Sequence, residues 1–91
     1  MIQEAVLVQN KLGLHARAAA KLVRLTSRFR SDIYLCREGN RQQVDSKSIL
    51  GILILAAAQG TRLVFSIDGP DEVQAAKAIR ELFDQRFGEQ S

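Results

Sequence analysis

Apolar residues change their spacing repeatedly along this chain, and these changes constrain its fold more than any other feature. Residues 2–9, 32–37 and 61–67 place apolar side chains at alternate positions, which is typical of half-buried strands. Residues 16–28 and 70–87 carry apolar side chains three and four positions apart, which predicts two helices with one buried face each. The buried face of the helix over residues 70–87 is expected to contain Val73, Ala76, Ile79 and Phe83.

Two shorter segments complete the order of elements. The residues EGN at 38–40 predict a tight turn, and residues 41–45 then form a short strand that makes a hairpin with the strand before the turn. The run 49–58 is rich in Leu and Ala and follows the capping side chains of residues 45–48, which favours a short helix. A buried strand fits the same continuous apolar composition.

The resulting order is β-α-β-β-α-β-α over 91 residues. A chain of this length has room for one hydrophobic core, so we predict a single domain over residues 1–91. Hairpins and helices in this order predict an α+β fold, in which a mostly antiparallel four-stranded sheet carries three helices on one face.

Composition argues against several other classes of protein. The longest apolar run, Ile49 to Ala58, is 10 residues long, whereas a membrane span needs about 20. The single cysteine, Cys36, cannot form an internal disulfide, and the N-terminal residues do not resemble a signal peptide. We therefore expect a cytoplasmic monomer with no membrane insertion. One histidine and one cysteine are too few for a typical His/Cys metal site, and no glycine-rich nucleotide loop is present, so we expect no metal and no bound cofactor.

Positive charge is concentrated in one part of the chain. Residues 11–41 contain eight Lys and Arg residues against Asp32 and Glu38, a net charge of +6 within a chain whose total is +3. This indicates an acidic partner such as nucleic acid, phosphate or an acidic protein surface, although a solvated basic helix face explains the same count. The absence of Trp and the presence of only one Tyr argue against an RNA-binding sheet, so no nucleic acid is expected.

The only histidine, His15, directly precedes an alanine-rich run with strong helix propensity, which places it at or next to a helix N-cap. The first amides of a helix have no intrahelical partner and, with the helix dipole, form an anion site. We expect Ala16, Arg17 and Ala18 to form this cradle, with the guanidinium of Arg17 suited to phosphate oxygens. The pattern fits a phosphoryl group carried transiently on the imidazole. A surface histidine beside an ordinary helical arginine fits it as well.

Two separated motifs resemble those of the histidine-containing phosphocarrier (HPr) family of the bacterial phosphotransferase system. They are GLHAR at 13–17 and KSILG at 47–51, and the length and element order match as well. The resemblance implies an open-faced β-sandwich. It also implies that His15 accepts a phosphoryl group on Nδ1 from phosphorylated Enzyme I, which is charged from phosphoenolpyruvate, and that Arg17 stabilises it. An EIIA-type protein would then accept the group, which makes the chain a stoichiometric carrier and not a turnover enzyme.

The chain departs from the family pattern at Ala18, where the family usually has proline. Alanine restores an N–H near the phosphoryl group and leaves the first turn less rigid. The segment NKLGLHARAAAKL is more similar to the nitrogen-branch carriers (NPr) than to the sugar-uptake carriers. Sugar uptake and nitrogen-related regulation both remain open as the output.

Other positions have two interpretations each. Ser48 aligns with a serine that a dedicated kinase phosphorylates in some family members, and it also suits a helix cap. Leu50 and Leu53 form either part of the core or, with Lys21 and Arg24, a docking surface for acidic and apolar partner faces. An alternative function is a regulatory docking module of the same fold that acts without phosphoryl transfer, and the presence of His15 favours the carrier.

Overall fold

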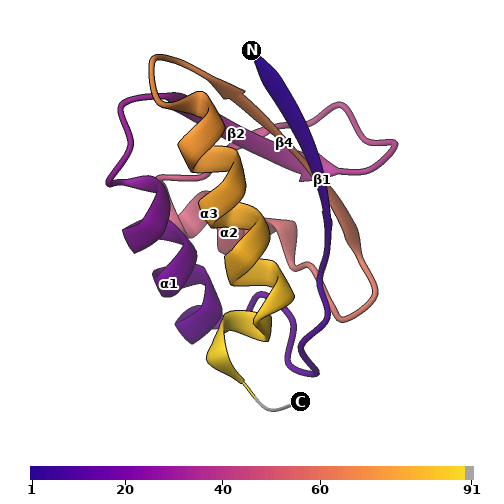
Figure 1. Cartoon of the computed structure of the whole chain (residues 1–91). Coiled ribbons are helices and arrows are strands. Elements are labelled where there is room, and N and C mark those ends of the chain that lie inside the picture. Colours follow the sequence, from indigo (N-terminus) through magenta and orange to yellow (C-terminus); the bar gives the residue numbers. More distant parts are fainter. Residues whose placement is uncertain (90–91) are drawn as a thin grey trace.

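One four-stranded antiparallel sheet forms the frame of the chain (Figure 1). The structure, a computed structural model, describes residues 1–89. The strand order in the sheet is β1-β4-β2-β3, so the first strand and the last strand of the sequence are neighbours at one side. The strands are β1 (Ile2–Leu7), β2 (Asp32–Arg37), β3 (Val44–Asp45) and β4 (Arg62–Asp68).

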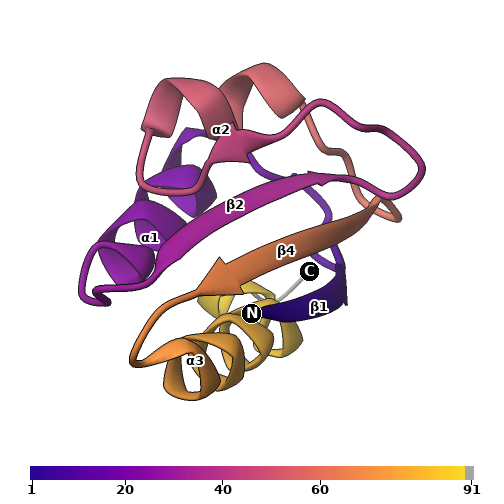
Figure 2. The same ribbon diagram turned by 90° about the horizontal axis from the view of Figure 1, so that it is seen from above.

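Three helices cover one face of this sheet (Figures 1 and 2). They are α1 (Ala16–Thr26), α2 (Ile49–Leu55) and α3 (Glu72–Asp84), and a short turn of 3₁₀ helix, η1 (Arg86–Gly88), follows α3. Helix α1 contacts both other helices, and α2 lies next to β3. The predicted order and the α+β open-faced sandwich are therefore confirmed. Within residues 1–89 no helix is both long and apolar enough to cross a membrane.

The core lies between the sheet and the helices. Alternate residues of the central strands point toward the helices and are fully buried, as Leu63, Phe65 and Ile67 of β4 show. Helix α1 contributes Ala18, Ala19 and Leu22, and α3 contributes Ala75, Ile79 and Phe83. The sheet residues between the buried ones face away from the helices, so no helix within residues 1–89 covers the other face of the sheet.

The buried face of α3 differs from the prediction at its start. Val73 is 67% exposed, whereas Ala75 is fully buried. Ala75, Ile79 and Phe83 follow one another at four-residue spacing along one side of the helix, and Val73 lies about 200° around the helix from Ala75. The prediction that Val73 is a core residue was therefore wrong.

The ends of several elements also differ from the predicted ends. Helix α3 begins at Glu72 and not at Pro70, because the carboxylate of Asp71 accepts hydrogen bonds from the backbone N–H of Arg30 and from Ser31. Helix α2 ends at Leu55, where Ala56 adopts a left-handed conformation with φ of 50° and Arg37 donates to the last carbonyls. Strand β3 has two residues where five were expected.

Candidate functional site around His15

His15 is the N-cap of α1, as the sequence predicts. Its carbonyl oxygen accepts the first helical hydrogen bond from Ala19 N at 2.8 Å. Its Nδ1 accepts a hydrogen bond from Arg17 N at 3.3 Å, so this nitrogen faces the open end of the helix. The imidazole thus provides the side-chain cap that Ser, Thr, Asp or Asn usually provides.

The backbone before His15 is fixed by a close approach to the segment after α2. Leu14 N donates to Ala57 O at 2.9 Å, and the Leu14 side chain is buried. Gly13 adopts φ of 68°, and a Cβ at this position would lie 2.5 Å from Ala57 O. Only glycine fits both the left-handed conformation and this distance. The glycine of the 13–17 motif therefore sets the position of the histidine.

The first turn of α1 offers amide groups that no neighbouring residue uses. Within residues 1–89, the N–H groups of Ala16 and Ala18 have no hydrogen-bond partner. Arg17 is exposed on the same turn, while the Ala18 side chain is fully buried. Free amides, the positive end of the helix dipole and a guanidinium favour an anionic group next to Nδ1.

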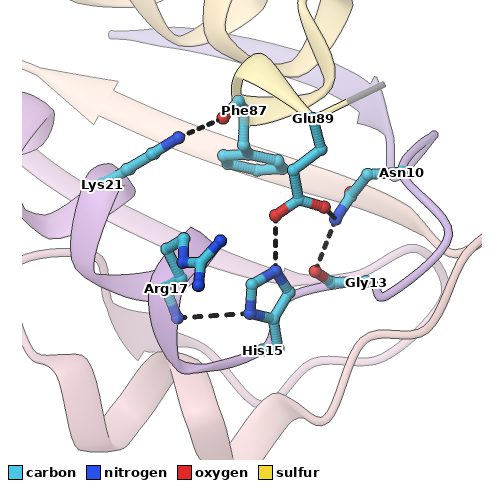
Figure 3. A network of polar contacts seen from close by, with 7 residues as sticks. All are labelled: Asn10, Gly13, His15, Arg17, Lys21, Phe87 and Glu89. Atoms are coloured by element: carbon cyan, nitrogen blue, oxygen red, sulfur yellow. Dashed lines mark hydrogen bonds and ion pairs between the residues drawn. The ribbon is translucent and has the colours of Figure 1, made fainter. Parts of the chain in front are cut away.

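The second ring nitrogen of His15, Nε2, is hydrogen-bonded to Glu89, a residue that the sequence did not predict to be part of the site. Glu89 Oε2 lies 2.5 Å from His15 Nε2, and the two side chains are 15% and 26% exposed (Figure 3). Asn10 Nδ2 donates to the other carboxylate oxygen of Glu89 at 2.9 Å and to Gly13 O at 2.8 Å. Burial raises the pKa of Glu89, but hydrogen bonds from Asn10 and His15 outweigh it, so the pKa of this carboxyl lies below its ordinary value.

Lys21 and Arg24, two residues of the predicted docking surface, differ in their surroundings. The ammonium group of Lys21 donates to Phe87 O at 2.5 Å, which joins α1 to the turn after α3. Arg24 lies in the last turn of α1 and is exposed. Its side chain is therefore open to a partner, whereas that of Lys21 also has a structural role.

Helix α2 presents an apolar surface to solvent. Leu50 and Leu53 are 68% and 37% exposed, whereas Ile52 is the fully buried residue of this helix. The interpretation of Leu50 and Leu53 as core residues is therefore wrong. Ile49 and Ile54 are exposed beside them, so four large apolar side chains are uncovered on a helix that contacts α1.

Ser48 caps this helix. Its side chain accepts a hydrogen bond from Gly51 N at 3.3 Å, and the residue is exposed. The capping interpretation is confirmed, and the hydroxyl stays accessible to solvent.

Known proteins resemble this chain in both sequence and fold. Residues 2–85 match the family model described as "PTS HPr component phosphorylation site", which places the chain among the phosphocarriers of the phosphotransferase system. The phosphocarrier protein HPr of Xylella fastidiosa is 49% identical over 89 residues, 98% of both chains. That of Cupriavidus necator is 47% identical over the same length and coverage. A crystal structure of HPr from Thermoanaerobacter tengcongensis matches with a TM-score of 0.93 and 38% identity over 100% of both chains. The chain belongs to the HPr family.

Proposed function

We propose that His15 Nδ1 accepts a phosphoryl group from phosphorylated Enzyme I and passes it to an EIIA-type acceptor. One observation carries this assignment to Nδ1. This nitrogen faces the free amides of the first turn of α1, 3.3 Å from Arg17 N, while Nε2 is occupied by Glu89. Membership in the HPr family supports the role of carrier.

The phosphoryl group is accepted and held by groups at this helix end. The lone pair of Nδ1 forms the new N–P bond, and the nitrogen of the phosphorylated donor keeps the electron pair of the bond that breaks. The phosphoryl oxygens would then meet the N–H groups of Ala16 and Ala18 and the guanidinium of Arg17, which spread their charge. Phosphoenolpyruvate is the upstream source in this proposal, and the chain itself needs no cofactor.

The exposed apolar side chains of α2 are suited to bind both partners. Leu50 and Leu53 supply an apolar patch, and Arg24 and Lys21 on α1 add positive charge, which favours a partner face that is apolar and acidic. Ser48 caps the same helix, and its exposed hydroxyl fits phosphorylation by a serine kinase. A phosphate there would add negative charge beside the patch and weaken the binding of an acidic partner.

A labelling experiment tests the proposal. Incubation with Enzyme I, Mg²⁺ and labelled phosphoenolpyruvate should add one acid-labile, base-stable phosphoryl group, and His15→Ala should abolish it. A second incubation with EIIA-type proteins of the sugar and nitrogen branches should remove the label and identify the branch. An unlabelled wild-type protein, under conditions that label another HPr, would refute the carrier function and favour the docking module.

A further inference from the structure

We infer that Glu89, held in place by Asn10, selects the tautomer of His15 in which Nδ1 carries the nucleophilic lone pair. The inference deepens the proposed function and rests on it. Glu89 is a positioning residue, because it acts through the imidazole and does not face the nitrogen that would receive the phosphoryl group. Figure 3 shows Glu89 and the Arg17 amide at different nitrogens of the ring.

The two contacts of the ring require the same tautomer. A carboxylate can only accept hydrogen bonds, so Nε2, 2.5 Å from Glu89 Oε2, must carry the proton of the neutral ring. A backbone N–H can only donate, so Nδ1, 3.3 Å from Arg17 N, must be unprotonated. The Arg17 contact is long, and the Glu89 contact is short. The carboxylate therefore makes the larger contribution to the choice of tautomer.

Asn10 fixes the carboxylate from a buried position. Its side chain is fully buried, and its single amide nitrogen donates to both Gly13 O and Glu89 Oε1. Both partners accept only, which fixes the orientation of the amide. The same side chain therefore holds the backbone before His15 and the carboxylate that contacts its ring.

The turn after α3 brings Glu89 to this position. Arg86, Phe87 and Gly88 have φ of 54°, 57° and 77°, so three successive residues are left-handed, two of them not glycine. Such conformations are unfavourable for residues with a Cβ and persist only where neighbouring contacts compensate. Phe87 is buried against Phe83, with ring centroids 4.8 Å apart, and Lys21 binds its carbonyl oxygen. These contacts hold a strained turn whose next residue is Glu89.

The carboxylate also balances the charge that the transfer creates. Attack by Nδ1 leaves the ring with a phosphoryl group on Nδ1 and a proton on Nε2, which gives the ring one positive charge. Glu89 faces that proton in both states, because the phosphoryl group is added at the other nitrogen. The contact therefore survives transfer and stabilises the charged ring.

The substitution Glu89→Gln separates this role from simple packing. An amide has one acceptor oxygen, and Asn10 Nδ2 needs it, which turns the NH₂ group toward His15 Nε2. The variant should therefore favour the wrong tautomer, with the proton on Nδ1, as an amide does in place of the triad carboxylate of serine proteases. Glu89→Ala should leave a mixture of tautomers. Glu81→Gln, at an exposed position of α3, is the matched control.

The test measures the ¹⁵N chemical shifts of the His15 ring in ¹⁵N-labelled protein and needs no partner protein. Wild type and Glu81→Gln should show a protonated Nε2 and an unprotonated Nδ1 in the neutral ring. In Glu89→Gln the ¹⁵N shift of Nε2 should move toward the wild-type value of Nδ1, and the shift of Nδ1 toward the wild-type value of Nε2. In Glu89→Ala both shifts should move toward the mean of the two wild-type values. The rate of phosphorylation by Enzyme I should fall about 10–100-fold in Glu89→Gln and less in Glu89→Ala.

Two results would overturn the inference. Unchanged ¹⁵N shifts in both folded Glu89 variants would show that Arg17 N alone sets the tautomer. Changed shifts with a wild-type rate of phosphorylation would show that the tautomer does not limit transfer. Failure of the proposed function is distinguishable, since wild type would then remain unphosphorylated whatever the shifts of the variants.

Discussion

A new charge on α2 should reduce stability only slightly on the exposed side of the helix and strongly on the buried side. Leu50 is 68% exposed, so only about a third of its apolar surface is removed from water. Full burial of a leucine contributes roughly 1.5–3 kcal/mol, which gives about 0.5–1 kcal/mol for this fraction. Leu50→Glu should therefore lower the free energy of unfolding by no more than about 1 kcal/mol.

Ile52 provides the contrast, because it is fully buried two residues further along the same helix. Truncation of a buried isoleucine alone costs about 2–5 kcal/mol, and an unpaired carboxyl adds to that. Since domains are stable by about 5–15 kcal/mol, Ile52→Glu should lose much of its stability. Thermal melts of the two variants should differ clearly.

Binding to Enzyme I should respond to Leu50→Glu much more than stability does. If Leu50 is an anchor of the docking surface, Leu50→Glu should weaken the binding of Enzyme I by about 2 kcal/mol, which is roughly thirtyfold in Kd. Calorimetric titration measures this change. Val73→Glu is the matched control, because Val73 is 67% exposed on a different helix. Wild-type affinity for Leu50→Glu, or a loss of affinity as large for Val73→Glu, would refute the placement of the docking surface on α2.

Three further predictions concern the ends of α1 and α3. Arg17→Lys should keep the charge and the fold but lose the planar guanidinium, so phosphorylation should slow more than stability falls, and equal rates would make Arg17 an ordinary surface residue. Ala18 is the third residue of α1 and its N–H is unused in residues 1–89, so Ala18→Pro should raise the free energy of unfolding by about 0.4–1 kcal/mol; an unfolded variant would contradict this. Hydrogen bonds from Ser31 and Arg30 lower the pKa of Asp71, so its contribution to stability should be complete above the ordinary carboxyl range near pH 4 and lost as pH falls below it. Acid titration of Asp71→Asn should show a weaker loss of stability over that range, and an unchanged curve would rule out this contribution.

The order of elements and the position of His15 could be predicted because both depend on residues close in sequence. Alternating apolar residues identify a strand, and an alanine-rich run after a histidine identifies a helix start, without knowledge of what packs against them. The start of α3 could not be located in this way. Its beginning depends on hydrogen bonds from Ser31 and Arg30, about 40 residues earlier, to the carboxylate of Asp71.

The environment of the imidazole depends even more on distant residues. Asn10 and Glu89 are 79 positions apart and form no motif, so only the fold brings them together at His15. Their meeting depends on three left-handed residues, two of which have side chains that give no sequence signal for this conformation. The apolar run of α2 posed a different problem, since it has no polar side and thus no pattern that separates Ile52 from Leu50.

The hydrogen bond from Leu14 N to Ala57 O has a consequence for the order in which partner proteins can bind. It links the segment before His15 to the segment that follows α2, so the exposed apolar side chains of α2 and Nδ1 of His15 keep a fixed relative position. A donor and an acceptor that recognise α2 would each meet Nδ1 in the same geometry and would therefore compete for one face. The two could not be bound together, and each cycle would require complete release of the first before the second arrives. Selection in such a carrier would favour short-lived complexes, with turnover limited by dissociation as much as by chemistry.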